Sequence, residues 1–202
     1  YWWRANRKRL DAEQLRDAIL LCSGRLDMRM GGPSFMPSIS DEALEGLSMK
    51  SGAYKASPPS ETNRRSIYMF AKRSLAVPMM SVFDACDTTA PIGRRDVSTV
   101  APQALALLNN EWVLAQCNAM AEQVIKEAKT TSERIETAWR IVLGRKPTSS
   151  ELKLANSYLQ YLGPEPTLSS DIDKSASRQS ELNRWIALCH TLVNTNEFIY
   201  LD

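Results

Sequence analysis

The sequence predicts an all-α fold of about six helices in a single domain over residues 1–202. Three observations predict it. Apolar residues recur at three- and four-residue steps along most of the chain, capping signals bracket these runs, and only one short stretch resembles a strand. With 202 residues, of which 44% are hydrophobic, the chain is long enough to bury one core.

The expected helices follow from this periodicity and from the residues at the ends of each run. Gly24 and Gly144 each stop a helical pattern, and Thr148 and Glu151 have the spacing of a capping box. The Asn109-Asn110 pair is a point where the longest pattern can divide into two helices. The helical spans predicted in chain order are 5–23, 40–47, 102–129, 132–143, 148–162 and 177–194.

The strand-like stretch runs from Ser66 to Phe70, which is rich in β-branched and aromatic residues. Its nearest partner is the segment 75–82, so at most a small β-hairpin is expected over 66–82, with Pro78 weakening it. The run 31–34, Gly-Gly-Pro-Ser, predicts a backbone corner. It lacks the Gly-Lys-Ser/Thr that completes a phosphate-binding loop.

Composition and charge exclude several classes of protein. The net charge of +2 is too small to indicate nucleic-acid binding, and no apolar run reaches the ~20 residues of a membrane-spanning helix. The four cysteines form no C-x-x-C pair, so we expect free thiols and no metal site or covalently attached haem in this chain. The only histidine, His190, lies on a helical pattern with no nucleophile motif nearby and is expected to be structural.

The region from Arg64 to Asp96 contains the candidate binding residues. Two Arg-Arg pairs bracket several aspartates, and such arginines bind a carboxylate, phosphate or sulfate, or else pair internally with the aspartates. We expect the internal network first and keep the anion site as the alternative. The candidate binding residues are Arg64, Arg65, Asp84, Asp87, Arg95 and Gln103, and Trp2 and Trp3 are the candidate partner contacts.

Several runs together resemble one family. They lie in order over nearly the whole chain: NRKRLDAE and LRDAIL in the first helical pattern, GGPS at 31–34, RRSIY from Arg64, PQALALLN from Pro102, LGRKPT from Leu143 and NEFIY from Asn196. They resemble the PSD-type planctomycete domain of unknown function. That family is found as the C-terminal part of large exported proteins, which often carry a cytochrome c-like haem domain upstream.

The resemblance implies an exported or periplasmic location, a larger parent protein, and a haem that belongs to a neighbouring domain. It carries over no catalytic residue. Our leading hypothesis is a non-catalytic binding or scaffolding module that docks upstream domains, or a cytochrome c-type partner, through Trp2, Trp3 and the Arg64–Asp96 region. The alternative is a hydrolase acting on polysaccharide or another anionic substrate, with Asp84 or Asp87 as acid or base and Arg95 holding the anion. A third hypothesis is an electron-transfer partner of the haem domain.

Overall fold

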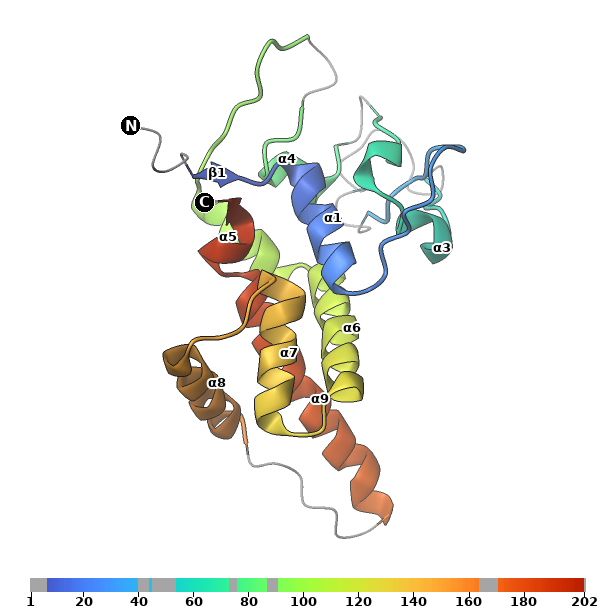
Figure 1. The fold of residues 1–202 in the computed structure, drawn as a ribbon. Helices are drawn as coiled ribbons and strands as arrows, with labels where there is room; N and C mark the ends of the chain where they lie inside the picture. Colours follow the sequence, from blue (N-terminus) through green and yellow to red (C-terminus); the bar gives the residue numbers. More distant parts are fainter. Residues whose placement is uncertain are drawn as a thin grey trace, which may run out of the picture. The chain divides into compact units, whose positions relative to one another are not determined.

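A computed structural model describes residues 7–39, 44, 54–72, 76–86, 91–163 and 171–201, with the backbone alone for 171–177, and it confirms a mainly helical fold (Figure 1). The chain groups into two compact units. Unit 1 consists mainly of residues 1–21 and 25–106, and unit 2 consists of residues 22–24 and 107–201. The single domain over 1–202 stays a prediction, and each unit is described by itself below.

The first half of the chain contains short elements joined by long connections. In chain order these are β1 (Lys8–Arg9), α1 (Ala12–Cys22), α3 (Pro59–Thr62), a 3-10 helix (Ser66–Tyr68), α4 (Pro78–Val82) and α5 (Ala101–Asn109). The first predicted helix therefore begins later than expected, because residues 8–9 are extended. The helix predicted over 40–47 lies almost entirely outside the described residues.

The small hairpin expected over 66–82 is wrong for the described part of that span. Ser66–Tyr68 forms a 3-10 helix, and Pro78 opens α4, where its missing N–H and its preset φ suit the first turn of a helix. Met69 forms an isolated parallel bridge with Phe35 and with no residue of 76–82. The extended conformation predicted for the β-branched and aromatic run is present at Met69. Its partner, Phe35, lies upstream in the sequence.

Unit 1 buries one face of α1 and two phenylalanines. Leu15, Ile19 and Leu20 are fully buried, as are Phe35 and Phe83. Two segments, 27–37 and 63–70, run side by side in this unit, because they are joined by bridges at Asp27–Arg64 and Phe35–Met69. The chain between these bridges, residues 28–34, forms a loop, which we call the glycine loop.

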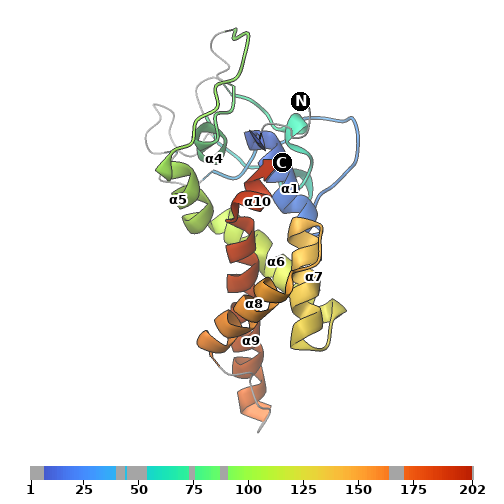
Figure 2. The ribbon, with the colours of Figure 1, turned by 60° about the vertical axis from the view of Figure 1, so that its left-hand side comes forward.

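Unit 2 is a group of longer helices. It contains α6 (Glu111–Glu127), α7 (Thr131–Leu143), α8 (Ser149–Tyr161), α9 (Asp171–Val193), α10 (Asn196–Ile199) and β2 (Tyr200–Leu201). Helix α6 packs against α9 and α7, and the two views agree on this arrangement (Figures 1 and 2). The buried residues that fill this core include Val113, Met120, Val124, Ile135, Ala138, Leu159, Trp185, Leu188 and Val193.

The capping signals of unit 2 are confirmed. Thr148 and Glu151 form the predicted capping box, and Gly144 ends α7 in the left-handed region at a φ of 69°. The Asn109-Asn110 pair separates two helices, because the Asn110 side chain accepts from the Trp112 and Val113 amides at the start of α6. Helix α7 begins at Thr131, one residue before the predicted span, and is capped by Thr130 and Glu133.

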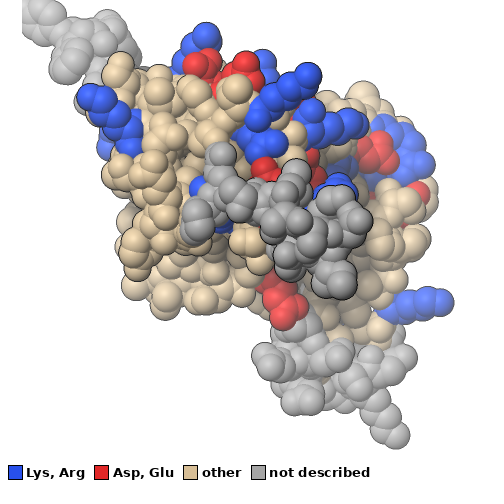
Figure 3. Space-filling model, turned by 90° about the horizontal axis from the view of Figure 1, so that it is seen from below, with Lys and Arg blue, Asp and Glu red and all other residues tan. Residues whose placement is uncertain are grey.

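The surface is mixed in charge. Figure 3 shows a face on which acidic side chains lie among the basic ones. This agrees with the near balance of 25 basic and 23 acidic residues. Among the described residues, no helix is long and apolar enough to cross a membrane.

Candidate functional site

Arg64 fills the inside of the glycine loop. Its side chain is 1% exposed, and it donates from Nη1 to the carbonyl of Pro33 at 2.5 Å and from Nη2 to the carbonyl of Gly31. The guanidinium lies over the Tyr68 ring, 4.1 Å from its centroid. Gly31 and Gly32 have φ of 75° and 83°, a region in which glycine is favoured, so the predicted corner is confirmed. The loop is therefore built around a buried cation.

Arg16 supports the other side of the same segment. It is buried on α1 and donates from Nη1 to the Arg64 carbonyl at 3.0 Å and to Ser66 Oγ at 3.1 Å. Burial lowers the pKa of Arg16 to about 10, which leaves it protonated at neutral pH. Asp17 accepts from the Ser66 amide and hydroxyl at 2.8 and 2.7 Å. Helix α1 thus holds the segment that carries Arg64.

Arg65 also lies near Tyr68. Its guanidinium is 5.8 Å from the ring centroid, and its buried Nε has no hydrogen-bond partner among the described residues. The Tyr68 hydroxyl accepts from the Gly31 amide at 2.8 Å. This bond, followed by one from the Arg65 side chain, lowers the pKa of Tyr68. Arg64 and Arg65 therefore share an aromatic partner, and within the described part of the chain neither pairs with Asp84 or Asp96.

Asp84 is the centre of a second, half-buried polar cluster. It has a φ of 57°, a left-handed conformation that aspartate tolerates better than most residues. Its carboxylate accepts from Arg9 Nη2 at 2.7 Å, from the Ser98 amide at 2.8 Å and from Ser98 Oγ at 2.9 Å. The Ser98 amide, ahead of Arg9, lowers the pKa of Asp84. These bonds occupy both carboxylate oxygens.

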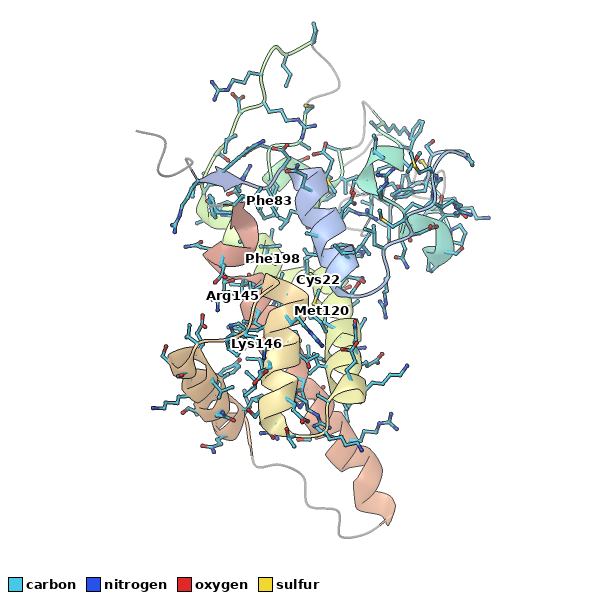
Figure 4. All side chains as sticks on the ribbon, viewed as in Figure 1. Cys22, Phe83, Met120, Arg145, Lys146 and Phe198 are labelled. Atoms are coloured by element: carbon cyan, nitrogen blue, oxygen red, sulfur yellow. The ribbon has the colours of Figure 1, made fainter. Side chains whose placement is uncertain are left out.

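Gln103 closes the same cluster. Its Nε2 donates to the Val82 carbonyl at 3.1 Å and to Ser98 Oγ at 3.1 Å. Arg9 donates to the carbonyls of Ser98 and Phe83 at 2.9 and 3.2 Å (Figure 4 labels Phe83). Two of the predicted site residues, Asp84 and Gln103, are therefore brought together, and both hold backbone in place.

Arg95 pairs with an upstream carboxylate. It donates to both oxygens of Glu13 at 2.6 and 2.9 Å, a bidentate geometry that lowers the pKa of Glu13 and raises that of Arg95. This pair fastens the segment after residue 91 to α1. The pairing of Arg64, Arg65 or Arg95 with Asp84 that the internal network predicted is wrong, because Asp84 pairs with Arg9 and Arg95 pairs with Glu13. Trp2, Trp3 and Asp87 lie outside the described residues.

A pocket of about 350 Å³ lies at the glycine loop. Its lining includes Arg64, which is a predicted binding residue. It also includes residues that are not among the predicted binding residues: Arg29, Gly32, Ser34, Ser57 and Glu61. The signal available in the sequence was the Gly31-Gly32 pair, because two glycines in the left-handed region leave the backbone open to a neighbour. This is the cavity that the candidate site offers.

Two further polar side chains of unit 2, His190 and Arg145, have structural partners. The sole histidine, His190, lies 3.0 Å through Nε2 from the Leu107 carbonyl, in keeping with its expected structural role. Arg145, at the end of α7, bridges Glu151 at 2.6 Å and Glu197 at 2.5 Å, and joins the start of α8 to α10 (Figure 4). Among the described residues, no group of three His, Cys, Asp or Glu side chains could hold a metal ion.

All four cysteines are free thiols, as expected. Cys86 is exposed, whereas burial raises the pKa of Cys22 to about 11 and that of Cys117 to about 12, and raises that of Cys189 further. We expect Cys86 to react first with a maleimide at pH 8, with the other thiols at least ~100-fold slower, because the thiolate is the reactive species. Mass spectrometry of timed samples measures this, and Cys86→Ser should remove the fast phase. A fast phase that survives in Cys86→Ser would contradict the assignment.

The fold and these contacts define a mainly helical protein in which buried arginines hold backbone carbonyls and carboxylates. The chain belongs to the PSD1 family, described as "Protein of unknown function (DUF1553)", whose family model matches residues 1–159. The predicted family is therefore confirmed. No curated protein and no solved structure matches the chain.

Proposed function

We propose that the chain is a non-catalytic binding module that docks onto other domains of a larger exported protein. The observation that carries this proposal is a set of exposed apolar side chains on the two paired segments of unit 1. Met28, Met30, Ile67 and Phe70 are 61, 78, 77 and 45% exposed. The two segments that carry them are joined by the bridges Asp27–Arg64 and Phe35–Met69. Exposed apolar groups on neighbouring segments are typical of interaction sites, and methionine adapts to the shape of a partner.

The charged residues of unit 1 support a binding role more than an acid–base role. A hydrolase would need a carboxylate that is open to a substrate and to water. Both oxygens of Asp84 are occupied by Arg9 and Ser98, and Arg95 is held by Glu13. No observation among the described residues favours the hydrolase, and we do not propose it.

The proposed partner is the rest of the parent polypeptide, in an exported or periplasmic setting. The family resemblance supports this partner, because it implies that the domain belongs to a larger protein with a haem domain. Any haem would belong to a neighbouring domain, and a cytochrome c-type domain is the partner we would test first. The exposed apolar set on residues 28–30 and 67–70 would supply the contact area.

The test measures binding of this chain to the upstream part of its parent, produced as a separate polypeptide, by isothermal titration calorimetry. We expect saturable binding that Met30→Asp and Ile67→Asp each weaken about tenfold or more, because a charge would be buried in an apolar contact. Leu154→Asp on α8 is the matched control, since Leu154 is 72% exposed in unit 2. It should leave both affinity and thermal midpoint unchanged. No binding, or equal weakening by the control, would overturn the proposal.

A further inference from the structure

The pocket at the glycine loop is too small for a large ligand and is rich in hydrogen-bond donors. Its volume of about 350 Å³ is at the low end of the ~300–1,000 Å³ of ligand pockets. Among the described residues, the amides of Gly32 and Ser34 donate to no acceptor, although both residues are exposed. A side chain on Gly31 would meet no atom within 4 Å, so the backbone at this point faces open space.

The charges that line the pocket are two guanidiniums and one carboxylate. Glu61 accepts from Arg29 Nη2 at 2.9 Å, whereas its other oxygen is 3.9 Å from Arg64 Nη1. The close partners of Arg64 are neutral carbonyls, and its buried Nε has no hydrogen-bond partner among the described residues. Asp27 also forms an ion pair with Arg29, with its Oδ2 3.3 Å from Nη2, although it does not line the pocket. The two guanidiniums are therefore balanced by two carboxylates, and what the pocket offers to an anion is the N–H donors of Arg29 and of the loop backbone.

We infer that this pocket binds a carboxylate group, which the docking partner would present as an Asp or Glu side chain or as a chain terminus. Arg29 is the residue best placed to bind this carboxylate, because its side chain is 55% exposed. Its guanidinium can form two parallel hydrogen bonds to an incoming carboxylate in place of Glu61. The free amides at 32 and 34 would donate to the same anion, as backbone N–H groups do in anion-binding loops. The carboxylate of Glu61 disfavours a dianion such as phosphate.

This inference rests on the proposed binding function, but its first test needs no partner. The ¹⁵N-labelled chain is titrated with sodium acetate at constant ionic strength, and amide chemical shifts are followed by NMR. We expect saturable shifts of the Gly32 and Ser34 amides with a dissociation constant in the millimolar range, because so small a ligand gains little binding energy. Inorganic phosphate at pH 8 should bind more weakly than acetate.

Two variants with opposite expected effects sharpen the test. Arg29→Gln should weaken acetate binding at least tenfold, because it removes the exposed guanidinium. Glu61→Gln should strengthen it about threefold or more, because it removes the competing negative charge. Arg140→Gln is the matched control, since Arg140 is a 65% exposed arginine that pairs with one glutamate in unit 2. It should leave the acetate affinity unchanged.

The outcomes separate the two proposals. Absence of saturable shifts, equal effects of Arg29→Gln and Arg140→Gln, or tighter binding of phosphate than of acetate would overturn the carboxylate site. If the chain binds the upstream domains but not acetate, only this inference fails. If it binds acetate but no part of its parent, the docking function fails and the carboxylate site stands.

Discussion

Replacing Arg64 with alanine is expected to lower the free energy of unfolding of unit 1 by about 2–4 kcal/mol. The change removes two hydrogen bonds from a charged donor, worth about 1.5–3 kcal/mol each, and water recovers part of that loss at the exposed glycine loop. It also removes the contact of the guanidinium with Tyr68. The loop would lose the side chain around which its backbone is arranged.

The measurement is urea unfolding combined with amide hydrogen exchange. Faster exchange is expected at the Asp27 and Phe35 amides, which donate to the carbonyls of Asn63 and Tyr68. Arg64→Lys should recover only part of the stability, because an ammonium cannot place two donors in the geometry of the guanidinium fork. Arg94→Ala, a change at an exposed arginine of the same unit, is the control. If Arg64→Ala and Arg94→Ala had the same small effect, the structural role of Arg64 would be refuted.

Replacing Asp84 with alanine is expected to cost about 3–5 kcal/mol, because it leaves the buried charge of Arg9 without its carboxylate partner. Alanine is also disfavoured at a φ of 57°. Asp84→Asn should cost less, since asparagine tolerates this conformation and keeps an oxygen for the Ser98 amide. Urea unfolding at pH 7 measures both differences.

The contribution of Asp84 to the free energy of unfolding should decrease as the pH falls. Hydrogen bonds from Ser98 and Arg9 lower the pKa of Asp84 in the folded state below the ordinary value of about 3.9. The contribution is therefore fully present above the ordinary pKa and is lost as the pH falls through the folded-state pKa. The stability gap between the native chain and Asp84→Asn should narrow from pH 6 towards pH 2. Asp96→Asn, a change at an exposed aspartate of the same unit, is the matched control. A constant gap for Asp84→Asn would contradict the assignment.

The helices and their ends were largely predictable from the sequence. The Thr148–Glu151 capping box, the Gly144 stop and the break at Asn110 were all confirmed. Each of these signals involves residues no more than four positions apart, so nearby residues suffice to read it. The prediction of a hairpin over 66–82 is wrong for the described part of that span, because a strand needs a partner that the local sequence does not specify.

The partners of the buried charges could not be read from the sequence. Arg9 lies 75 positions before Asp84, and Glu13 lies 82 positions before Arg95. The nearer arginine pairs and aspartates were the obvious matches by type and distance along the chain, but folding brought other groups together. The same holds for the pocket, because Arg29, Ser57 and Glu61 come from separate segments and share no motif.

The sequence by itself determined the family, the mainly helical class and the ends of most helices, because periodicity and capping act over a single helical turn. Only the tertiary structure decided that Arg64 holds the glycine loop, that Asp84 is enclosed by Arg9 and Ser98, and that Arg29 stands at a pocket. A buried charge takes the partner that folding brings within hydrogen-bond distance, and that proximity depends on the whole path of the chain.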